Sequence, residues 1–319
     1  MIESPRAGSL NGLDLEAVVD EAYRYVETYR GHGRQASYIP ALQEVDPNKL
    51  AIAVALGDGR TASAGDAEEC FSIQSISKVF TLSLVLDRVG AILWNRVGRE
   101  PSGSPFNSIV QLEEEKGKPR NPLINAGAIV VSDQLIGTDT ADAAVADLLS
   151  FLRLRAEDPS IAIDEGVAMS ESQAGALNRS LAHFVAAFGN LDNPVEEVLS
   201  VYFRQCAVAM SCRQLAHAAL YLAFDGVDPL SGERVTTPDH SRRILSLMLT
   251  CGHYDNSGDF AFRIGLPGKS GVGGGILTIA PGIGSIAVWS PGLNQAGTSL
   301  AGAVALEQIA EATGWSVFA

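Results

Sequence analysis

Cysteines, basic runs and long apolar stretches are all scarce in this sequence of 319 residues. It has four cysteines, and no two of them form a Cys-x-x-Cys pair: Cys70, Cys206, Cys212 and Cys251. This spacing argues against a disulfide framework and predicts reduced thiols. Residues 1–6 have neither the charged nor the apolar region of a secretory leader, so a cytoplasmic protein is expected.

Charge, hydropathy and histidine spacing exclude further classes of protein. The 23 basic and 37 acidic residues give a net charge of −14 without a basic run, so we expect no nucleic-acid partner. The apolar stretch 79–93 is interrupted by Asp87 and Arg88 and falls short of the roughly 20 residues that cross a membrane. The five histidines show no pairing typical of zinc ligands, so neither a metal ion nor a cofactor is expected.

Hydrophobic residues make up 46% of the chain, enough for a large core. Residues 1–12 are expected to form a loose tail before one domain over 13–319. Gly57-Asp58-Gly59 predicts a strand hairpin over about 50–65, and a Gly-rich turn predicts a second strand pair over about 273–290. Apolar residues at helical spacing predict helices over about 14–30, 138–154, 171–188, 194–206, 213–224 and 299–313.

Strands near both chain ends, with helices between them, indicate an α+β fold. One mixed or antiparallel sheet would be built from both ends and flanked by helices. We expect a sheet part over about 13–74 and 226–319, and a helical part over about 75–225.

The motif Ser75-Ile-Ser-Lys78 precedes an apolar run that predicts a buried helix. Ser75 would lie in the first turn of this helix, with Lys78 one turn later on the same face. A serine hydroxyl needs a base to become a nucleophile, and a lysine kept neutral by burial or by a nearby cation can serve. Ser-x-x-Lys also occurs by chance, and the plain alternative is a solvated helix face.

A second motif, Lys269-Ser270-Gly271, comes just before the C-terminal strand pair. Serine enzymes of the β-lactamase and penicillin-binding class combine Ser-x-x-Lys with such a strand. Gly271 would let the backbone approach Ser75, and the N–H groups of Val272 and Ser75 could form an oxyanion hole. The plain alternative is a hairpin with a solvent-facing lysine. A P-loop is excluded, because Arg263 stands where that motif needs glycine.

Several longer motifs resemble the serine-dependent glutaminase family from about Tyr38 to the C-terminus. They are Phe71-Ser-Ile-Gln-Ser-Ile-Ser-Lys78, Asn121-Pro-Leu-Ile-Asn125, Tyr202-Phe-Arg-Gln-Cys206, Cys251-Gly-His-Tyr254-Asp255, the Gly-rich segment 265–275 and Gly314-Trp-Ser-Val-Phe318. The resemblance implies a β-lactamase/DD-peptidase-like catalytic domain, hydrolysis of L-glutamine to L-glutamate and ammonia, and a homodimer or homotetramer.

The resemblance also implies roles for individual residues. Ser75 is the nucleophile, Lys78 its base, Tyr254 a proton relay or support, and Val272 an oxyanion-hole donor. The residues expected to hold the amino-acid substrate are Tyr38, Asn125, Glu171, Asn178, Tyr202, Tyr254 and Val272.

The chemistry of free glutamine agrees with these roles, because its α-ammonium and α-carboxylate both lose water on binding and need partners. Glu171 suits the ammonium, and Asn and Tyr donors suit the carboxylate and the amide. Glu171 and Asn178 are seven residues apart, so one helix would present both on one face. The alternative for Glu171 is an acid in a first helical turn that Ser170 caps.

Two other functions stay open at this stage. A β-lactamase or penicillin-binding hydrolase is suggested by Ser132-Asp133-Gln134, which comes near the Ser-Asp-Asn element of that class. A non-catalytic module on the same scaffold would bind an amino acid without turnover. The chain departs from the glutaminase pattern at Ala176-Leu177, usually Asp-Arg, and at His253 and Asn256, where Met and Ala are expected.

Overall fold

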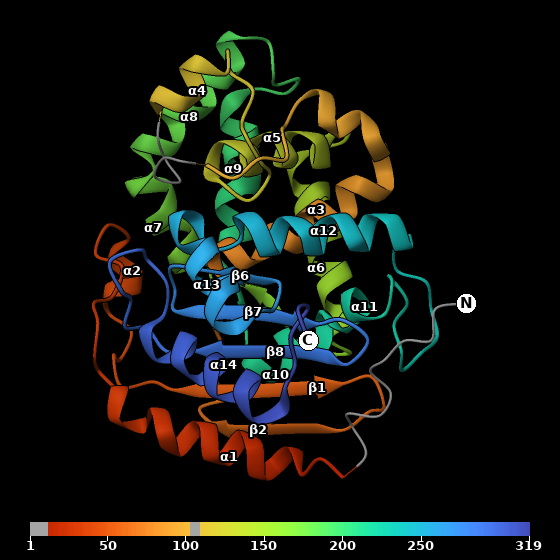
Figure 1. The fold of residues 1–319 in the computed structure, drawn as a ribbon. Helices are drawn as coiled ribbons and strands as arrows, with labels where there is room; N and C mark the ends of the chain where they lie inside the picture. Colours follow the sequence, from red (N-terminus) through yellow and green to blue (C-terminus); the bar gives the residue numbers. More distant parts are fainter. Residues whose placement is uncertain (1–11, 103–108) are drawn as a thin grey trace.

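The structure is a computed structural model that describes residues 12–102 and 109–319. The tail predicted over residues 1–12 lies outside the described residues except for Gly12. A five-stranded antiparallel sheet has the order β2-β1-β8-β7-β6, and its hairpins confirm the two predicted strand pairs. Its strands are β1 (Ala51–Leu56), β2 (Thr61–Gly65), β6 (Gly268–Ser270), β7 (Gly275–Ala280) and β8 (Gly284–Trp289). The sheet is therefore built from both ends of the chain, as predicted (Figure 1).

The sheet separates two apolar cores because side chains alternate along each strand. In β1, Ile52 and Val54 belong to the core under α1 (Leu15–Val26) and α14 (Leu300–Thr313). Ala51, Ala53 and Ala55 face the other core, where α10 (Cys212–Ala218) packs closely on β1 and β8. The small alanines allow this close approach of a helix to the sheet.

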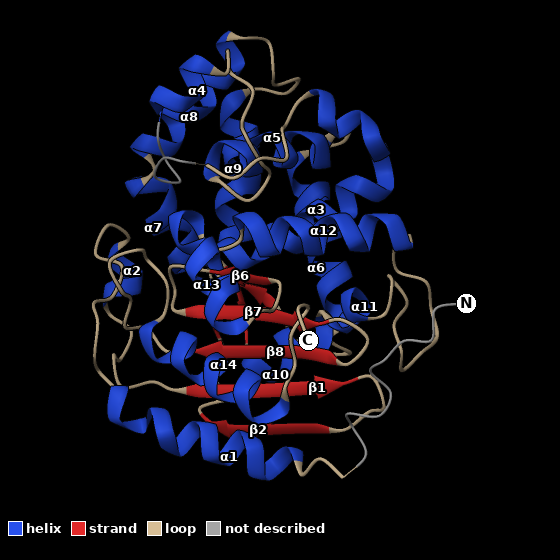
Figure 2. Cartoon of the chain, viewed as in Figure 1, coloured by secondary structure: helices blue, strands red, loops and turns tan. Residues whose placement is uncertain are grey.

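The larger core continues into a helical region that lies beside the β6 edge of the sheet (Figure 2). Its two central helices, α3 (Ser77–Val89) and α5 (Asn125–Ile136), are buried along almost their whole length. The remaining helices are α2 (Pro40–Gln43), α4 (Ile109–Glu114), α6 (Ala141–Arg155), α7 (Glu165–Ala174), α8 (Ala176–Ala187), α9 (Val195–Cys206), α11 (Leu220–Ala223), α12 (Pro238–Cys251) and α13 (Ser257–Ile264). In the part of the chain that the structure describes there are also four 3₁₀ turns: η1 (Glu27–Tyr29), η2 (Gln74–Ile76), η3 (Gly90–Asn95) and η4 (Tyr254–Asn256).

A second, small sheet of order β3-β5-β4 connects the two regions and was not predicted. Its strands are β3 (Phe71–Ser72), β5 (Val208–Met210) and β4 (Ala162–Ile163). With two or three residues each, these strands are too short to show a periodic pattern. The sheet nevertheless matters for the site, because β3 leads directly into the segment that carries Ser75.

Two helices predicted as continuous are each split in the structure. The predicted helix over 171–188 is wrong, because α7 ends and α8 begins around Gly175. A Cβ at Gly175 would lie 2.5 Å from Phe203 Cζ and 2.9 Å from Glu171 O, so only glycine fits there. The predicted helix over 213–224 is likewise split into α10 and α11.

The division of 13–319 into a sheet part and a helical part stays a prediction. The range 75–225 holds most of the helices, although α10 within it packs on the sheet. Within the described ranges, no helix is both long and apolar enough to cross a membrane.

Candidate active site

Ser75 lies at the junction between the small sheet and the buried helix α3. It belongs to the 3₁₀ turn η2, two residues before α3 begins, so the predicted position in the first α-helical turn is off by part of a turn. Its side chain is hydrogen-bonded to Tyr254 of η4. The turn thus presents the hydroxyl at the N-terminal end of α3, whose N–H groups favour negative charge.

Lys78 is the second residue of α3 and is fully buried. Its Nζ donates to Asn125 Oδ1 at 2.8 Å and to Leu123 O at 3.4 Å, and it lies 5.7 Å from the centroid of the Tyr202 ring. Burial lowers the pKa of Lys78 from 10.5 to about 8, although the nearby Glu171 opposes this. In the described part of the chain, no hydrogen bond joins Lys78 to Ser75 directly. Such contacts often close only when substrate binds.

Tyr254 connects Ser75 to Lys269, the lysine of the second motif. Lys269 is buried on β6, and its Nζ lies 4.4 Å from the centroid of the Tyr254 ring while donating to Gly252 O and Ser270 O. Burial raises the pKa of Tyr254 to about 12, so the phenol is neutral at physiological pH. Burial and the neighbouring Lys78 hold the pKa of Lys269 well below 10.5. The alternative of a hairpin with a solvent-facing lysine is therefore excluded.

Gly271 brings the backbone after β6 against the turn that carries Ser75. A Cβ at this position would lie 2.6 Å from Ile73 O and 3.4 Å from Ser75 N, so only glycine allows the approach. The next residue, Val272, is buried beside the same turn. Among the backbone hydrogen bonds of the described residues, none uses the Val272 N–H as donor.

A cavity of about 330 Å³ opens beside these groups. Four residues predicted to bind substrate line it: Tyr38, Asn125, Glu171 and Asn178. The rest of the lining is formed by Ile39, Ala174, Gly175 and Leu177. Asn125 joins the cavity to the lysine, since its Oδ1 accepts from Lys78 Nζ and its Nδ2 donates to Asn178 Oδ1 at 3.0 Å. The exposed Tyr38 forms part of the cavity's outer wall.

Glu171 is the acidic residue of this cavity and is only 5% exposed. Burial raises its pKa from 4.5 to about 7, while a hydrogen bond from Gln74 and the charge of Lys78 lower it. It stands near the C-terminal end of α7. Asp164 caps the N-terminal end of this helix, so the alternative in which Ser170 caps a helix that begins at Glu171 is wrong. The same-helix argument is also wrong: Glu171 and Asn178 lie on α7 and α8, and the break at Gly175 brings both to the cavity.

Tyr202 lies on α9, deeper than the cavity wall, and is 3% exposed. Its ring faces Lys78 Nζ, and its side chain is hydrogen-bonded to the buried Cys206 thiol. Burial holds the pKa of Tyr202 well above 10, so it remains a neutral donor. The structure thus gathers Ser75 and Lys78 with the other predicted residues around one site.

Comparison with protein families matches residues 33–318 to the family Glutaminase. The chain belongs to the glutaminase family. It is therefore an enzyme, a hydrolase that acts on an amide C–N bond, and its α+β fold is β-lactamase-like.

Relatives of known sequence and structure cover almost the whole of this glutaminase-family chain. A Glutaminase of Rhizobium rhizogenes is 60% identical over 305 residues, which are 96% of this chain and 99% of the relative. The probable glutaminase YbaS is 38% identical with a TM-score of 0.91, over 98% of this chain and 99% of its own. The Bacillus subtilis glutaminase YbgJ, solved as a covalent complex with 5-oxo-L-norleucine formed from 6-diazo-5-oxo-L-norleucine, is 32% identical with a TM-score of 0.84 over 95% of this chain and 99% of its own.

The Ser132-Asp133-Gln134 element has a structural role in this member of the glutaminase family. Asp133 is buried and accepts hydrogen bonds from the backbone N–H groups of Asp192 and Asn193, at 2.9 to 3.1 Å, and from Arg96. These hydrogen bonds hold the loop that precedes α9 against helix α5. Asn125, at the other end of α5, provides the polar contact to Lys78.

Two residues of the site were not among the predicted site residues. Lys269 was noted only as part of its motif, and its contact with the Tyr254 ring depends on the fold. Gln74 was missed, although it stands directly before Ser75. It has φ = 50°, and Tyr254 has φ = 53°; such left-handed non-glycine residues concentrate at functional sites. Sequence patterns carry no signal for this conformation at glutamine or tyrosine.

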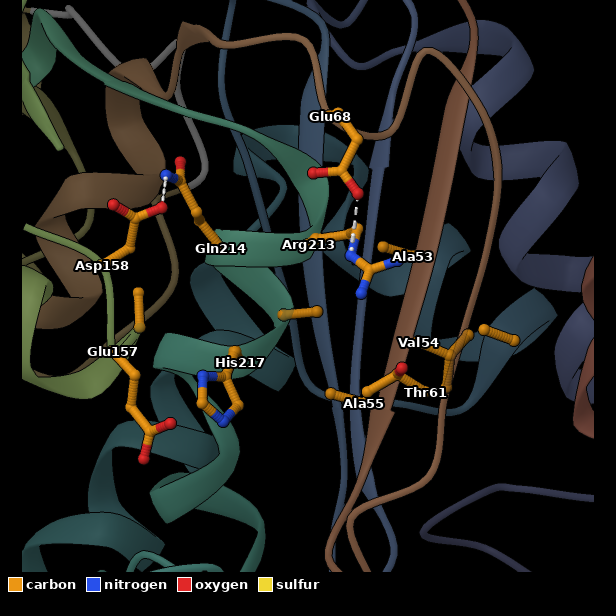
Figure 3. Close-up of a pocket in the computed structure, with 13 residues that line it drawn as sticks. Ala53, Val54, Ala55, Thr61, Glu68, Glu157, Asp158, Arg213, Gln214 and His217 are labelled. Atoms are coloured by element: carbon orange, nitrogen blue, oxygen red, sulfur yellow. Dashed lines mark hydrogen bonds and ion pairs between the residues drawn. The ribbon is translucent and has the colours of Figure 1, made fainter. Parts of the chain in front are cut away.

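A second cavity, of about 350 Å³, lies between β1, β2 and α10 (Figure 3). It shares no lining residue with the first, and none of its residues was predicted to be functional. Arg213 pairs there with Glu68 at 3.0 Å, and Gln214 donates to Asp158 at 2.7 Å. Among residues 12–102 and 109–319, no group of three or more His, Cys, Asp or Glu side chains lies close enough together to hold a metal ion.

Proposed function

We propose that the protein hydrolyses L-glutamine to L-glutamate and ammonia through a glutamyl ester on Ser75, with Lys78 as the general base. The observation that carries this proposal is the buried Lys78, whose pKa of about 8 gives it a neutral fraction at physiological pH. A lysine in this state can take the proton of a serine hydroxyl.

The cavity supplies partners for both charged groups of glutamine. We assign the α-ammonium to Glu171, the carboxylate of the cavity wall. Tyr38, Asn125, Asn178 and Tyr202 supply phenol and amide groups for the α-carboxylate and the side-chain amide. A glutamine held in this way would direct its side-chain amide toward Ser75, where the N–H groups of Val272 and Ser75 would receive the amide oxygen.

The reaction then has two steps. Ser75 Oγ attacks the amide carbon as its proton passes to Lys78 Nζ, and Tyr254 steadies Oγ through its hydrogen bond. Collapse of the intermediate breaks the C–N bond, and the leaving nitrogen takes a proton from Lys78 and departs as ammonia. Water, activated by the neutral Lys78, attacks the ester and releases glutamate, and Ser75 recovers its proton.

The relatives support this proposal. The Bacillus subtilis glutaminase forms a covalent complex with a glutamine-like diazoketone, as expected for an enzyme with a nucleophile in its glutamine site. The remaining assignments stay predictions. The cytoplasmic location is supported by four cysteines that are all free thiols. The homo-oligomer is supported by Phe262 and Phe318, apolar side chains that are 90% and 71% exposed.

Covalent labelling tests the nucleophile directly. The wild-type protein should release glutamate and ammonia from glutamine, and 6-diazo-5-oxo-L-norleucine should add one equivalent, which peptide mass spectrometry should locate on Ser75. Ser75→Ala should lose at least about 10³-fold in kcat and take up no label, while its thermal unfolding stays near wild type. Ser83→Ala, which removes a buried hydroxyl further along α3 that bonds Val79 O and Tyr221 outside the site, serves as the control and should retain the label. Label on another residue, or full turnover by Ser75→Ala, would contradict the mechanism. Asparagine and a β-lactam, assayed in parallel, test the substrate class.

A further inference from the structure

We propose that His253 is a positioning residue for Tyr254 that also responds to acid. Its neutral ring holds residues 252–257, which we call the Tyr254 turn, against β6, and a proton on the ring releases this turn. The inference rests on the proposed function, because Tyr254 is the residue that steadies Ser75 Oγ. His253 is also one of the positions at which the chain departs from the glutaminase pattern.

The ring of His253 is packed between two elements. It is fully buried and stacks on Phe260 of α13, with the ring centroids 3.5 Å apart and the planes at 16°. A Cβ at Gly268 of β6 would lie 2.7 Å from His253 Nε2 and 2.7 Å from Phe260 Cε1, so only glycine leaves room for both rings. Directly before the ring, Gly252 O accepts a hydrogen bond from the Ser270 N–H of β6 at 3.2 Å. The side chain therefore joins α13 to β6.

The backbone of the Tyr254 turn connects this packing to the nucleophile. The His253 N–H donates to Ser257 Oγ at 3.0 Å, and Ser257 Oγ donates to Tyr254 O at 2.9 Å. Tyr254 has a left-handed φ of 53° and is hydrogen-bonded through its side chain to Ser75. Such a conformation persists only where the surrounding structure imposes it, and the packed ring directly before Tyr254 helps to do so.

Both ring nitrogens of His253 are buried without a hydrogen-bond partner among the described residues. A neutral imidazole leaves one donor and one acceptor unpaired there, whereas an imidazolium ion would bury two unpaired donors and a full charge. Burial, and after it the charge of Lys269, hold the pKa of His253 well below 6.5. The closed Tyr254 turn therefore accepts the neutral ring and disfavours the charged one.

The elements packed around the ring offer no acid that could pair with an imidazolium ion. The last turn of α12, together with η4, α13 and β6, carries these titratable side chains: Cys251, Tyr254, Asp255, Asp259, Arg263 and Lys269. Asp255 and Asp259 are exposed to solvent, and neither is hydrogen-bonded to the ring. A protonated ring is therefore stable only in water, so a proton favours opening of the Tyr254 turn and separates Tyr254 from Ser75.

Hydrogen exchange of the Tyr254 turn tests this proposal without an activity assay. In the open turn the ring has the ordinary pKa of 6.5, so the opening constant of the wild type should rise about tenfold per pH unit below 6.5, once corrected for intrinsic exchange. In His253→Met, whose flexible side chain fills the space and takes up no proton, this constant should not change with pH. His183→Met, at an exposed position of α8, is the matched control and should behave as the wild type.

Activity relates the opening to Tyr254. The kcat of each protein is divided by its own value at pH 8, and the wild-type result is divided by that of His253→Met, so that the titrations of Lys78 and Glu171 cancel. This ratio should fall at least about threefold from pH 8 to pH 5, out of the roughly 30-fold that one proton with a pKa of 6.5 allows. It should recover when the protein is returned to pH 8.

Three results would overturn the proposal: a wild-type opening constant that does not change with pH, an equal rise in His253→Met, or a constant activity ratio. If thermal unfolding shows that His253→Met is not folded, His253→Leu takes its place, and exchange of the wild type tests the opening by itself. A wild-type protein without glutamine turnover at any pH would instead refute the proposed function, while the exchange experiment still tests the role of His253 in holding the turn.

Discussion

At the scale of single residues, the chemistry depends on the protonation state of Lys78. Its side chain is surrounded by the Asn125 amide, the Leu123 carbonyl and the Tyr202 ring, and it lies out of contact with water. Burial makes its charged form less stable, and the pKa falls to about 8. The Lys78 amine must be neutral to accept a proton, so the fraction of active enzyme should rise with pH as the Lys78 ammonium group loses its own proton.

This argument predicts a pH profile. The kcat/KM for glutamine should increase with pH and level off above about 8, with a steeper fall below about 7, where Glu171 takes up a proton. Lys78→Arg should lose about 10² to 10⁴-fold in kcat at every pH, because a guanidinium does not lose its proton. Lys49→Arg, a change in a surface ion pair, is the control and should keep the wild-type profile. A Lys78→Arg variant with an unaltered profile would show that the base is another group.

At this scale, sequence patterns predicted which residues belong to the site, but they did not predict the contacts between the side chains. Motif spacing suggested Ser75 and Lys78, the family resemblance added Asn125 and Glu171, and the structure brings all four together. The hydrogen bond between Ser75 and Tyr254 involves left-handed backbone at Tyr254, and Gln74, directly before Ser75, has the same conformation. Surrounding structure imposes that conformation, and the local sequence does not favour it.

At the scale of elements, hairpins were easier to predict than helix ends. The Asp58-Gly59 turn and the Gly-rich turn are local signals, and both strand pairs are confirmed. The break between α7 and α8 has no such signal. Gly175 is required because Phe203, 28 positions later, fills the space beside it. Ala176 and Leu177, which follow Gly175, are residue types common in helices. Hydrophobic periodicity alone therefore predicts one helix that continues through the break.

Gly271 offers a test at this scale, because it sets the distance between β6 and the turn of Ser75. In Gly271→Ala the added Cβ would lie 2.6 Å from Ile73 O, so the backbone must shift and carry the Val272 N–H with it. We expect kcat to fall about 10² to 10³-fold, the typical effect of losing one oxyanion-hole donor. Gly258→Ala is the control, because nothing lies within 4 Å of its Cβ position in α13, and it should be neutral or slightly stabilising. Equal activity of the two variants would argue against Val272 as a donor.

At the scale of the whole molecule, the composition and the ends of the chain indicated the architecture. Strand patterns near residue 50 and residue 280 suggested one shared sheet, and β1 does pair with β8. The small sheet β3-β5-β4 joins residues about 140 positions apart through very short strands, so it could not be recognised before folding. That sheet holds the end of β3 from which η2 and Ser75 continue.

The site also affects the stability of the whole fold, because it keeps the Glu171 carboxyl group buried at the cavity wall. The pKa of Glu171 is about 7 in the folded protein against an ordinary 4.5, so the folded state binds this proton more tightly than the unfolded chain. Its contribution to stability is complete below about pH 4.5 and is lost as pH rises to about 7. The difference between a pKa of about 7 and the ordinary 4.5 corresponds to a loss of at most about 3 kcal/mol.

Glu171→Gln should therefore stabilise the protein and weaken its binding of glutamine at the same time. At pH 8 we expect the free energy of unfolding in urea to rise by up to about 3 kcal/mol, whereas at pH 5 the variant and the wild type should differ little. Glu165→Gln, in the exposed first turn of the same helix, is the matched control and should change stability by only a few tenths of a kcal/mol at either pH. If Glu171→Gln and the wild type differed in unfolding free energy by the same amount at pH 5 and pH 8, Glu171 would ionise as freely in the folded protein as in the unfolded chain. The burial of this carboxylate would then not be what destabilises the fold.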